Sequence, residues 1–242
     1  MTPLESKHAG TWYAGVDGCH DGWIAVLLHF AGDTLTSVRH RLCTGFAQII
    51  ELPERPARTA VDIPIGLLDR ARHGGRDCDK AARRLLVARR NSVFSPPVRT
   101  VLSARDYSEA LARNRASSEA HIGISRQTWG ITPKIREVDG CMTPDLQERI
   151  VEAHPELAFL ALAGRPMQHN KKHTAGYAER CNVLREHYGS LLPDIHELRK
   201  QYGARRLAYD DILDACALAL TARRVHLGKA QRLPDNAPPI DA

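Results

Sequence analysis

Three strand-like stretches follow one another between residues 12 and 42, and only short turns separate them. WYAGVDG is rich in β-forming residues, GWIAVLLHF is a nearly continuous apolar run, and TLTSVRHRL alternates with period two. The linking turns, GCHD and AGD, are too short for a crossover connection. The three stretches are therefore predicted to form an antiparallel meander.

The following segments extend this meander into a mixed sheet. Thr44 is predicted to cap a short helix over GFAQIIEL, which stops at Pro53. RTAVDIPIG is then predicted to be a buried strand that ends at Pro64 and Gly66. The intervening helix allows this strand to return parallel beside the first one, which indicates an α/β domain.

The rest of the chain is predicted to be mainly helical. IVEAH is the last strand candidate, Pro155 suits the first turn of the helix after it, and Asp210 is expected to cap the final Ala/Leu-rich helix. Helices are expected from Asp77 or Asp79 to about Ala88, over 106–120, over 131–148 after the turn GISRQTWG, twice within 174–202, and over 210–227.

The composition favours one cytoplasmic domain. No apolar run approaches the roughly 18–20 residues that a membrane span needs, and no secretory signal pattern is visible. The six dispersed cysteines form no CxxC pair, which favours free thiols in a reducing cytosol. We expect a flexible N-terminus over residues 1–10, one domain over 11–228, and a Pro-rich disordered tail over 229–242.

The positive charge of the chain is concentrated in one segment. Residues 70–99 carry nine Lys and Arg side chains against two Asp, which gives this segment a charge of +7 in a chain whose net charge is +6. A concentrated basic segment is the electrostatic signature of a polyanion partner such as nucleic acid. A solvated arginine-rich helix without a partner explains the same pattern.

Two aspartates lie at the ends of two predicted strands. Asp17 lies between glycines in GVDG, which leaves room for a metal or phosphate, although an Asp-Gly turn residue is the simpler interpretation. Asp62 ends the strand in AVDIPIG, and a parallel pairing of the two strands would place both acids at one sheet edge. Neighbouring carboxylates repel each other unless a proton or a cation lies between them, so the pattern indicates a cation site.

The final helix supplies two more acids. Asp211 and Asp214 lie three residues apart in YDDILDACALALTARR and share the helix face that continues through Leu218. Aspartates are common in a first helical turn because the helix dipole favours them. Two acids on an apolar face are less easily explained in that way, and they are predicted to point toward the core.

Several long motifs together resemble one protein family. GVDGCHDGWIAV, VDIPIG, CDKAARRLLVARRNSVFSPPVR, SRQTWGITPKIREVD, VEAHPE and DDILDACALALTA are similar to the uncharacterised family of predicted ribonuclease H-like nucleases, domain of unknown function 429, from about residue 13 to 223. The resemblance implies an α/β, ribonuclease H-like fold: a five-stranded mixed sheet in the order β-β-β-α-β-α-β-α. A large helical insertion, about 70–149, precedes the last strand and departs from the minimal fold.

The resemblance also implies a site and a reaction. Asp17, Asp62, Asp211 and Asp214 would hold two Mg²⁺ or Mn²⁺ ions, and Asp17 would bridge them. A two-metal site of this kind hydrolyses phosphodiester bonds of nucleic acid. Glu152 is a further candidate metal ligand. Candidate phosphate contacts are Arg89, Arg90, Arg99, Lys134 and Arg136, each of which is otherwise an ordinary surface charge.

Two other functions fit the same sequence. An ATP-binding module of the actin kind also begins with an Asp-Gly strand turn, but no second glycine-rich phosphate hairpin appears in the C-terminal half. In a non-catalytic nucleic-acid-binding protein with a ribonuclease H-like fold, the basic segment would bind the nucleic acid and the four acids would have no catalytic role. The presence of all four carboxylates argues against the second alternative.

Overall fold

The computed structural model describes residues 10–235. Residues 1–9 and 236–242, which include most of the predicted flexible N-terminus and half of the predicted tail, lie outside the described residues. The chain divides into two compact units. Unit 1 comprises residues 10–62 and Asp145–Ala230, and unit 2 comprises Ile63–Pro144 with the residues from Gln231 onward.

Unit 1 is built on a five-stranded mixed sheet in the order β3-β2-β1-β4-β5. Neighbouring strands run antiparallel in the pairs β1/β2 and β2/β3 and parallel in the pairs β1/β4 and β4/β5. The predicted meander, the parallel return and the five-stranded mixed sheet are thereby confirmed. The strands are β1 (Thr11–Cys19), β2 (Gly22–Ala31), β3 (Thr34–Cys43), β4 (Arg58–Val61) and β5 (Ile150–Glu152).

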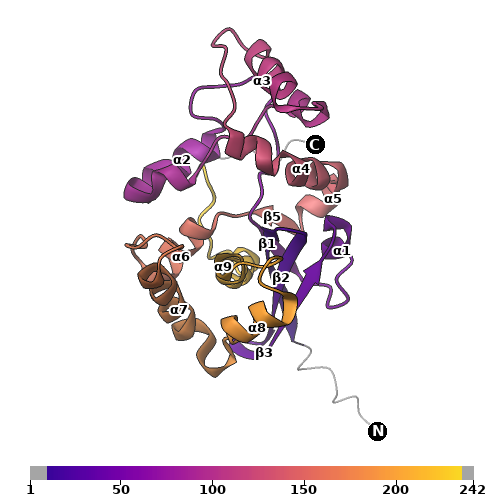
Figure 1. Cartoon of the computed structure of the whole chain (residues 1–242). Coiled ribbons are helices and arrows are strands. Elements are labelled where there is room, and N and C mark those ends of the chain that lie inside the picture. The colour runs from indigo at the N-terminus through magenta and orange to yellow at the C-terminus, as the bar shows by residue number, and fades with distance from the viewer. Residues whose placement is uncertain (1–9, 236–242) are drawn as a thin grey trace. The chain divides into compact units, whose positions relative to one another are not determined.

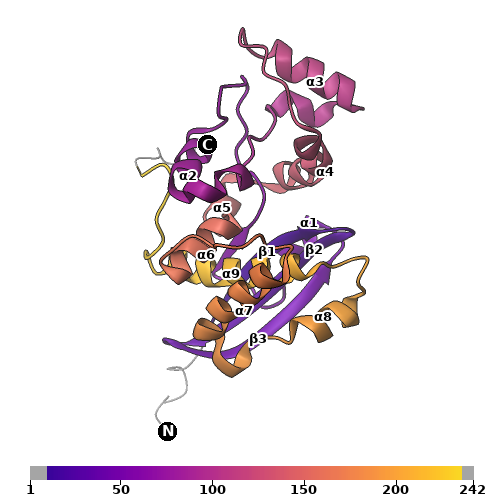
Figure 2. The same cartoon turned by 60° about the vertical axis from the view of Figure 1, so that its left-hand side comes forward.

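Helices cover both faces of this sheet (Figures 1 and 2), which explains why β2 is apolar apart from His29. On one face Trp23 of β2 lies edge-on to Phe46 of α1, and both side chains are fully buried. On the other face Ile24 and Val26 belong to the cluster that includes α9. The helices are α1 (Phe46–Ile50), α6 (Pro155–Ala163), α7 (Thr174–Tyr188), η3 (Gly189–Leu191), α8 (Ile195–Tyr202) and α9 (Tyr209–His226).

The central strand and the last helix are in direct backbone contact. A Cβ atom built on Gly15 of β1 would lie 2.0 Å from the Ala219 nitrogen and 2.1 Å from the Ala215 oxygen of α9. Only a residue without a side chain fits between strand and helix at this point. Gly15 therefore sets how closely α9 approaches the middle of the sheet.

Unit 2 contains the insertion between β4 and β5, and it has a small core of its own. Val98, Val101, Ala110 and Ile124 are buried together, and Trp129 packs against them. The helices of the insertion are α2 (Asp77–Leu86), η1 (Val87–Ser92), η2 (Arg99–Ser103), α3 (Tyr107–Ala116) and α4 (Arg126–Cys141), and α5 (Pro144–Gln147) follows at the boundary.

Three local predictions are wrong, and helix capping explains each one. Thr44 does not cap α1, because the N-cap is Gly45 and no side chain bonds there. Asp210 is not the N-cap of α9: the N-cap is Ala208, whose amide donates to Oδ2 of Asp211 at 2.9 Å. GISRQTWG is not a turn throughout, because Ser125 caps α4 and the helix already begins at Arg126.

The structure also bears on the predictions about membrane spans and free cysteines. Between residues 10 and 235, every helix is too short or too polar to cross a membrane. All six cysteines are free thiols, and four of them are buried. Burial raises the pKa of Cys216 to about 12, so this thiol stays protonated and acts as a small packing group.

Candidate functional site

The parallel pairing of β1 and β4 places two acids side by side. Val16 is aligned with Val61, and the amide of Asp62 donates to the carbonyl oxygen of Val16 at 3.0 Å. Asp17 follows Val16 and Asp62 follows Val61, so the two acids lie side by side at the carboxyl ends of the two strands. The structure thus brings these two predicted residues together, as the parallel return of β4 requires.

Helix α9 brings the other two acids to the same place. Gly15 and Asp17 point to the same sheet face because they are two positions apart. Since α9 touches Gly15 at Ala215 and Ala219, and the charges of Asp214 and Asp211 act on Asp17, the preceding turn of α9 lies over Asp17. That turn carries Asp214, which is 1% exposed, and Asp211, which is partly buried.

The four carboxylates influence one another electrostatically. Burial raises the pKa of Asp17 well above its usual range, and the charges of Asp62, Asp214 and Asp211 raise it further. Burial also raises the pKa of Asp62, and it raises the pKa of Asp211 and of Asp214 to about 6. Carboxyl groups in this state resist ionisation unless positive charge is supplied.

Lys171, which lies between α6 and α7, supplies some of that charge. Its Nζ atom lies 2.5 Å from Oδ2 of Asp214 and 3.5 Å from Oδ2 of Asp210. Burial lowers the pKa of Lys171, but Asp214 and Asp17 more than offset this and raise it above its usual value. Sequence reasoning missed this residue, because no periodicity or motif marks the HNKKHT segment.

The cluster offers ligand oxygens without a finished coordination shell. Within residues 10–235, no group of three or more His, Cys, Asp or Glu side chains is already arranged to hold a metal ion. However, Oδ1 of Asp214 is buried and has no hydrogen-bond partner. An unsatisfied buried carboxylate oxygen is costly, and it fits a cation as its partner. The donor set, all carboxylate oxygen, suits Mg²⁺ or Mn²⁺.

Two residues on the strand and turn that precede α6 border the cluster. Glu152 is exposed and aligned with Val61, one position short of Asp62, and its charge makes a small contribution to the raised pKa of Asp62. The charge of His154 lowers the pKa of Asp62. Nδ1 of His154 accepts the amide of Glu156 at 3.2 Å, so His154 caps α6. The His154 side chain is partly buried.

The five predicted phosphate contacts all lie in unit 2. Arg99 Nη1 donates to both carboxylate oxygens of Asp139 at 2.6 Å. Arg136 donates to the carbonyl oxygens of Leu102 and Ala104. The other three are Arg89 and Arg90 on η1 and Lys134 on α4, of which Arg90 is exposed.

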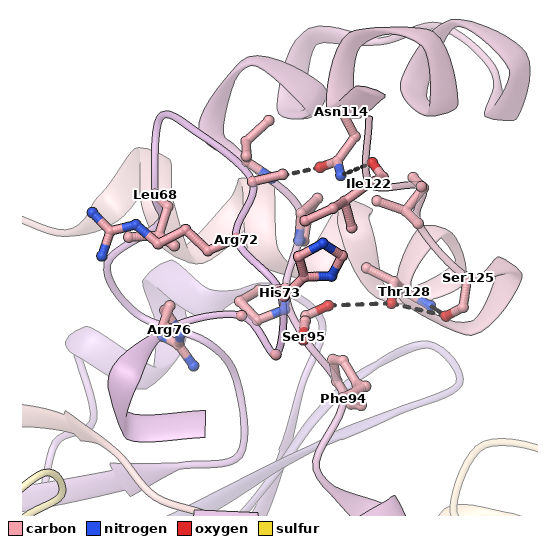
Figure 3. Close-up of a pocket in the computed structure, with 18 residues that line it drawn as sticks. Leu68, Arg72, His73, Arg76, Phe94, Ser95, Asn114, Ile122, Ser125 and Thr128 are labelled. Carbon is pink, nitrogen blue, oxygen red and sulfur yellow. Dashed lines mark hydrogen bonds between the residues drawn. The ribbon is translucent and has the colours of Figure 1, made fainter. Parts of the chain in front are cut away.

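Unit 2 also contains a pocket of about 250 Å³, and none of the four acids lines it (Figure 3). His73 and Phe94 lie at this pocket, together with Asn114, which comes from α3. Oδ1 of Asn114 accepts the amide of Val98, and its Nδ2 donates to the carbonyl oxygen of Ile122. Asn114 therefore links two loops of the insertion, which indicates a structural role for this side chain.

The raised pKa of Asp211 leads to a testable pH dependence. An acid whose pKa is about 6 in the folded protein, against an ordinary 3.8, stabilises the fold below pH 4 and loses that contribution as the pH rises through 6. Asp211→Asn keeps an oxygen for the Ala208 amide but cannot ionise. Without divalent ions, we expect the variant to gain roughly 2 to 3 kcal/mol relative to wild type between pH 4 and 7.

Urea unfolding of both proteins across this pH range, in the presence of a chelator, measures the difference. Asp145→Asn, on an exposed aspartate of α5, is the matched control and should follow wild type. A pH-independent difference between Asp211→Asn and wild type would contradict the prediction.

Comparisons with known proteins place the chain in a family. No curated protein matches it. A solved structure of Thermus thermophilus RuvC is similar to it at 14% sequence identity, over 91% of this chain and 98% of that chain, with a TM-score of 0.37. The family model described as Protein of unknown function (DUF429) matches residues 15–238, nearly the whole chain. The chain therefore belongs to this family, in agreement with the motifs in its sequence.

Proposed function

We propose that the chain is a nuclease that depends on Mg²⁺ or Mn²⁺ and hydrolyses phosphodiester bonds of nucleic acid. The observation that carries the proposal is the buried carboxyl group of Asp17, which faces the charges of Asp62, Asp211 and Asp214. Strand ends and a helix from distant parts of the chain converge to create this repulsion. A protein has little reason to retain such a cluster unless cations use it.

The chain's own residues would do two things at this site. Asp17, Asp62, Asp211 and Asp214 would hold the divalent ions. When bound, the divalent ions would lower the pKa of a water for in-line attack on phosphorus and would stabilise the leaving oxygen. The direct contact between Gly15 and α9 holds Asp211 and Asp214 of the helix close to the acids at the strand ends.

The substrate class follows from charge. The basic segment includes α2 and η1, where Arg84 and Arg90 are exposed and Arg83 and Arg89 are partly exposed. A phosphate backbone would bind such a surface with strong salt dependence, because binding releases condensed counterions. We therefore propose nucleic acid as the partner.

The test is direct cleavage by the purified full chain. Labelled single strands, duplexes, RNA–DNA hybrids and four-way junctions are incubated with Mg²⁺, with Mn²⁺, or with a chelator. We expect at least one substrate to be cut with Mg²⁺ or Mn²⁺ and none with the chelator. If the folded protein cuts no substrate with either ion, or cuts equally well with the chelator, the proposed function is wrong.

A further inference from the structure

Lys171 places a positive charge at the acid cluster, and this charge affects how many divalent ions the cluster can hold. Its ammonium group contacts Oδ2 of Asp214 at 2.5 Å and lies 3.5 Å from Oδ2 of Asp210. The Asp214 side chain is 1% exposed and that of Lys171 is 34% exposed, so a partly exposed ammonium group pairs with a buried carboxylate. One oxygen of Asp214 is therefore paired with a cation, and Oδ1 is buried without a hydrogen-bond partner.

The segment that carries Lys171 is held in place from both sides. Glu179 of α7 accepts the amides of Gln168 and His169 at 3.0 Å, and Arg165 pairs with it at 2.8 Å. Although burial acts in the opposite direction, these amides and Arg165 lower the pKa of Glu179 to about 2. The carboxylate therefore stays ionised and holds the segment at neutral pH.

Helix α7 fixes the same segment at a second point. Arg180, which is fully buried, donates to the carbonyl oxygen of His169 at 3.2 Å and pairs with Glu156 of α6 at 2.6 Å. A Cβ atom on Gly176 would lie 2.0 Å from the Asn170 oxygen, so the backbone next to Lys171 rests directly on α7. The backbone beside Lys171 is thus fixed by the fold, which keeps the ammonium group within reach of Asp214.

We propose that Lys171 takes the place of one of the two cations, so that the cluster binds a single divalent ion through Asp17, Asp62 and Oδ1 of Asp214. This inference rests on the proposed metal-dependent function. It replaces the two-ion arrangement that the family resemblance implies with one ion and one fixed ammonium group.

The reason is electrostatic. A second divalent ion on Oδ2 of Asp214 would share that oxygen with the ammonium group, and like charges a few ångströms apart repel each other beside a carboxylate that is 1% exposed. Oδ1 of the same carboxylate has no such competitor. Lys171 also supplies a positive charge that needs no ion from solution, and a fixed charge of this kind can stabilise the phosphate during the reaction.

The test is the stoichiometry of Mn²⁺ binding to the full chain, measured by calorimetry and by electron paramagnetic resonance. We expect one ion per chain in wild type and in Lys171→Arg, which keeps the charge. Lys171→Met removes the charge and should bind two ions. Lys172→Met, on the exposed neighbouring lysine, is the matched control and should bind one.

The unfolding free energy is a second readout that does not depend on activity. In a chelator, Lys171→Met should be less stable than Lys172→Met, because the acids lose the positive charge of Lys171. Added Mn²⁺ should abolish this difference in stability. Two ions bound to wild type, or one bound to a folded Lys171→Met, would overturn the inference and leave the proposed nuclease intact. An absence of Mn²⁺ binding, together with an absence of cleavage, would instead remove the proposed function itself. The wild-type stoichiometry decides the matter even if Lys171→Met does not fold.

Discussion

Asp17→Asn should reduce phosphodiester cleavage by roughly a thousand-fold or more while the protein stays folded. Asparagine matches aspartate in size, and its Oδ1 can still accept the Gly18 amide, which donates to Asp17 at 2.7 Å. What disappears is the negative charge at the point where the four acids meet. Single-turnover cleavage of the best substrate, with Mn²⁺ in excess, measures the effect.

The same substitution should leave the melting temperature equal to or above that of wild type when no divalent ion is present. Burial and three neighbouring carboxylates disfavour the ionised form of Asp17. A neutral asparagine at this position therefore removes a destabilising charge from the folded protein. Asp21→Asn is the matched control, because Asp21 lies in the turn after β1 but is exposed and pairs with His20 and Arg206. It should cleave like wild type. Equal cleavage by Asp17→Asn would point to a contaminant or to a different site.

Gly15→Ala should destabilise the protein by about 3 kcal/mol or more. The added methyl group would meet backbone atoms of α9 at 2.0 and 2.1 Å, and no change of side-chain rotamer can relieve such a clash. Helix α9 must shift, and Asp211 and Asp214 move with it, so we expect cleavage to fall as well. Urea unfolding measures the change in the free energy of unfolding.

Gly130→Ala provides the matched control for this prediction. Gly130 lies inside α4, and a Cβ atom built there meets nothing within 4 Å. Alanine is the better helix former, so this variant should gain about 0.5–1 kcal/mol. If Gly15→Ala is as stable as wild type, the close packing of β1 against α9 is not what holds the acids together.

The fold of unit 1 could be predicted because its sequence patterns are long and periodic. The three strands of the meander, the buried strand before Asp62 and the Ala/Leu-rich last helix all appear where their patterns place them. The errors fall at helix ends, which depend on single hydrogen bonds. Asp211, and not Asp210, accepts the amide of the N-cap residue Ala208, and periodicity cannot distinguish these two neighbours.

The candidate site could be predicted only in part, for a related reason. Asp17 and Asp62 follow from strand ends, and Asp211 and Asp214 follow from the apolar face of a helix. Lys171 depends on tertiary contacts instead, because Glu179 and Arg180 place its segment against the cluster. Such contacts join residues in no regular spacing, so a single sequence gives no sign of them.

The division of the chain between its two units has a consequence for how members of this family could diverge. All four acids and Lys171 belong to unit 1, whereas the nine basic side chains of residues 70–99 belong to unit 2, which has a core of its own. The insertion could therefore be lengthened, shortened or exchanged without rebuilding the carboxylate cluster. Substrate preference and bond-breaking chemistry would then evolve as separately inherited traits of one polypeptide.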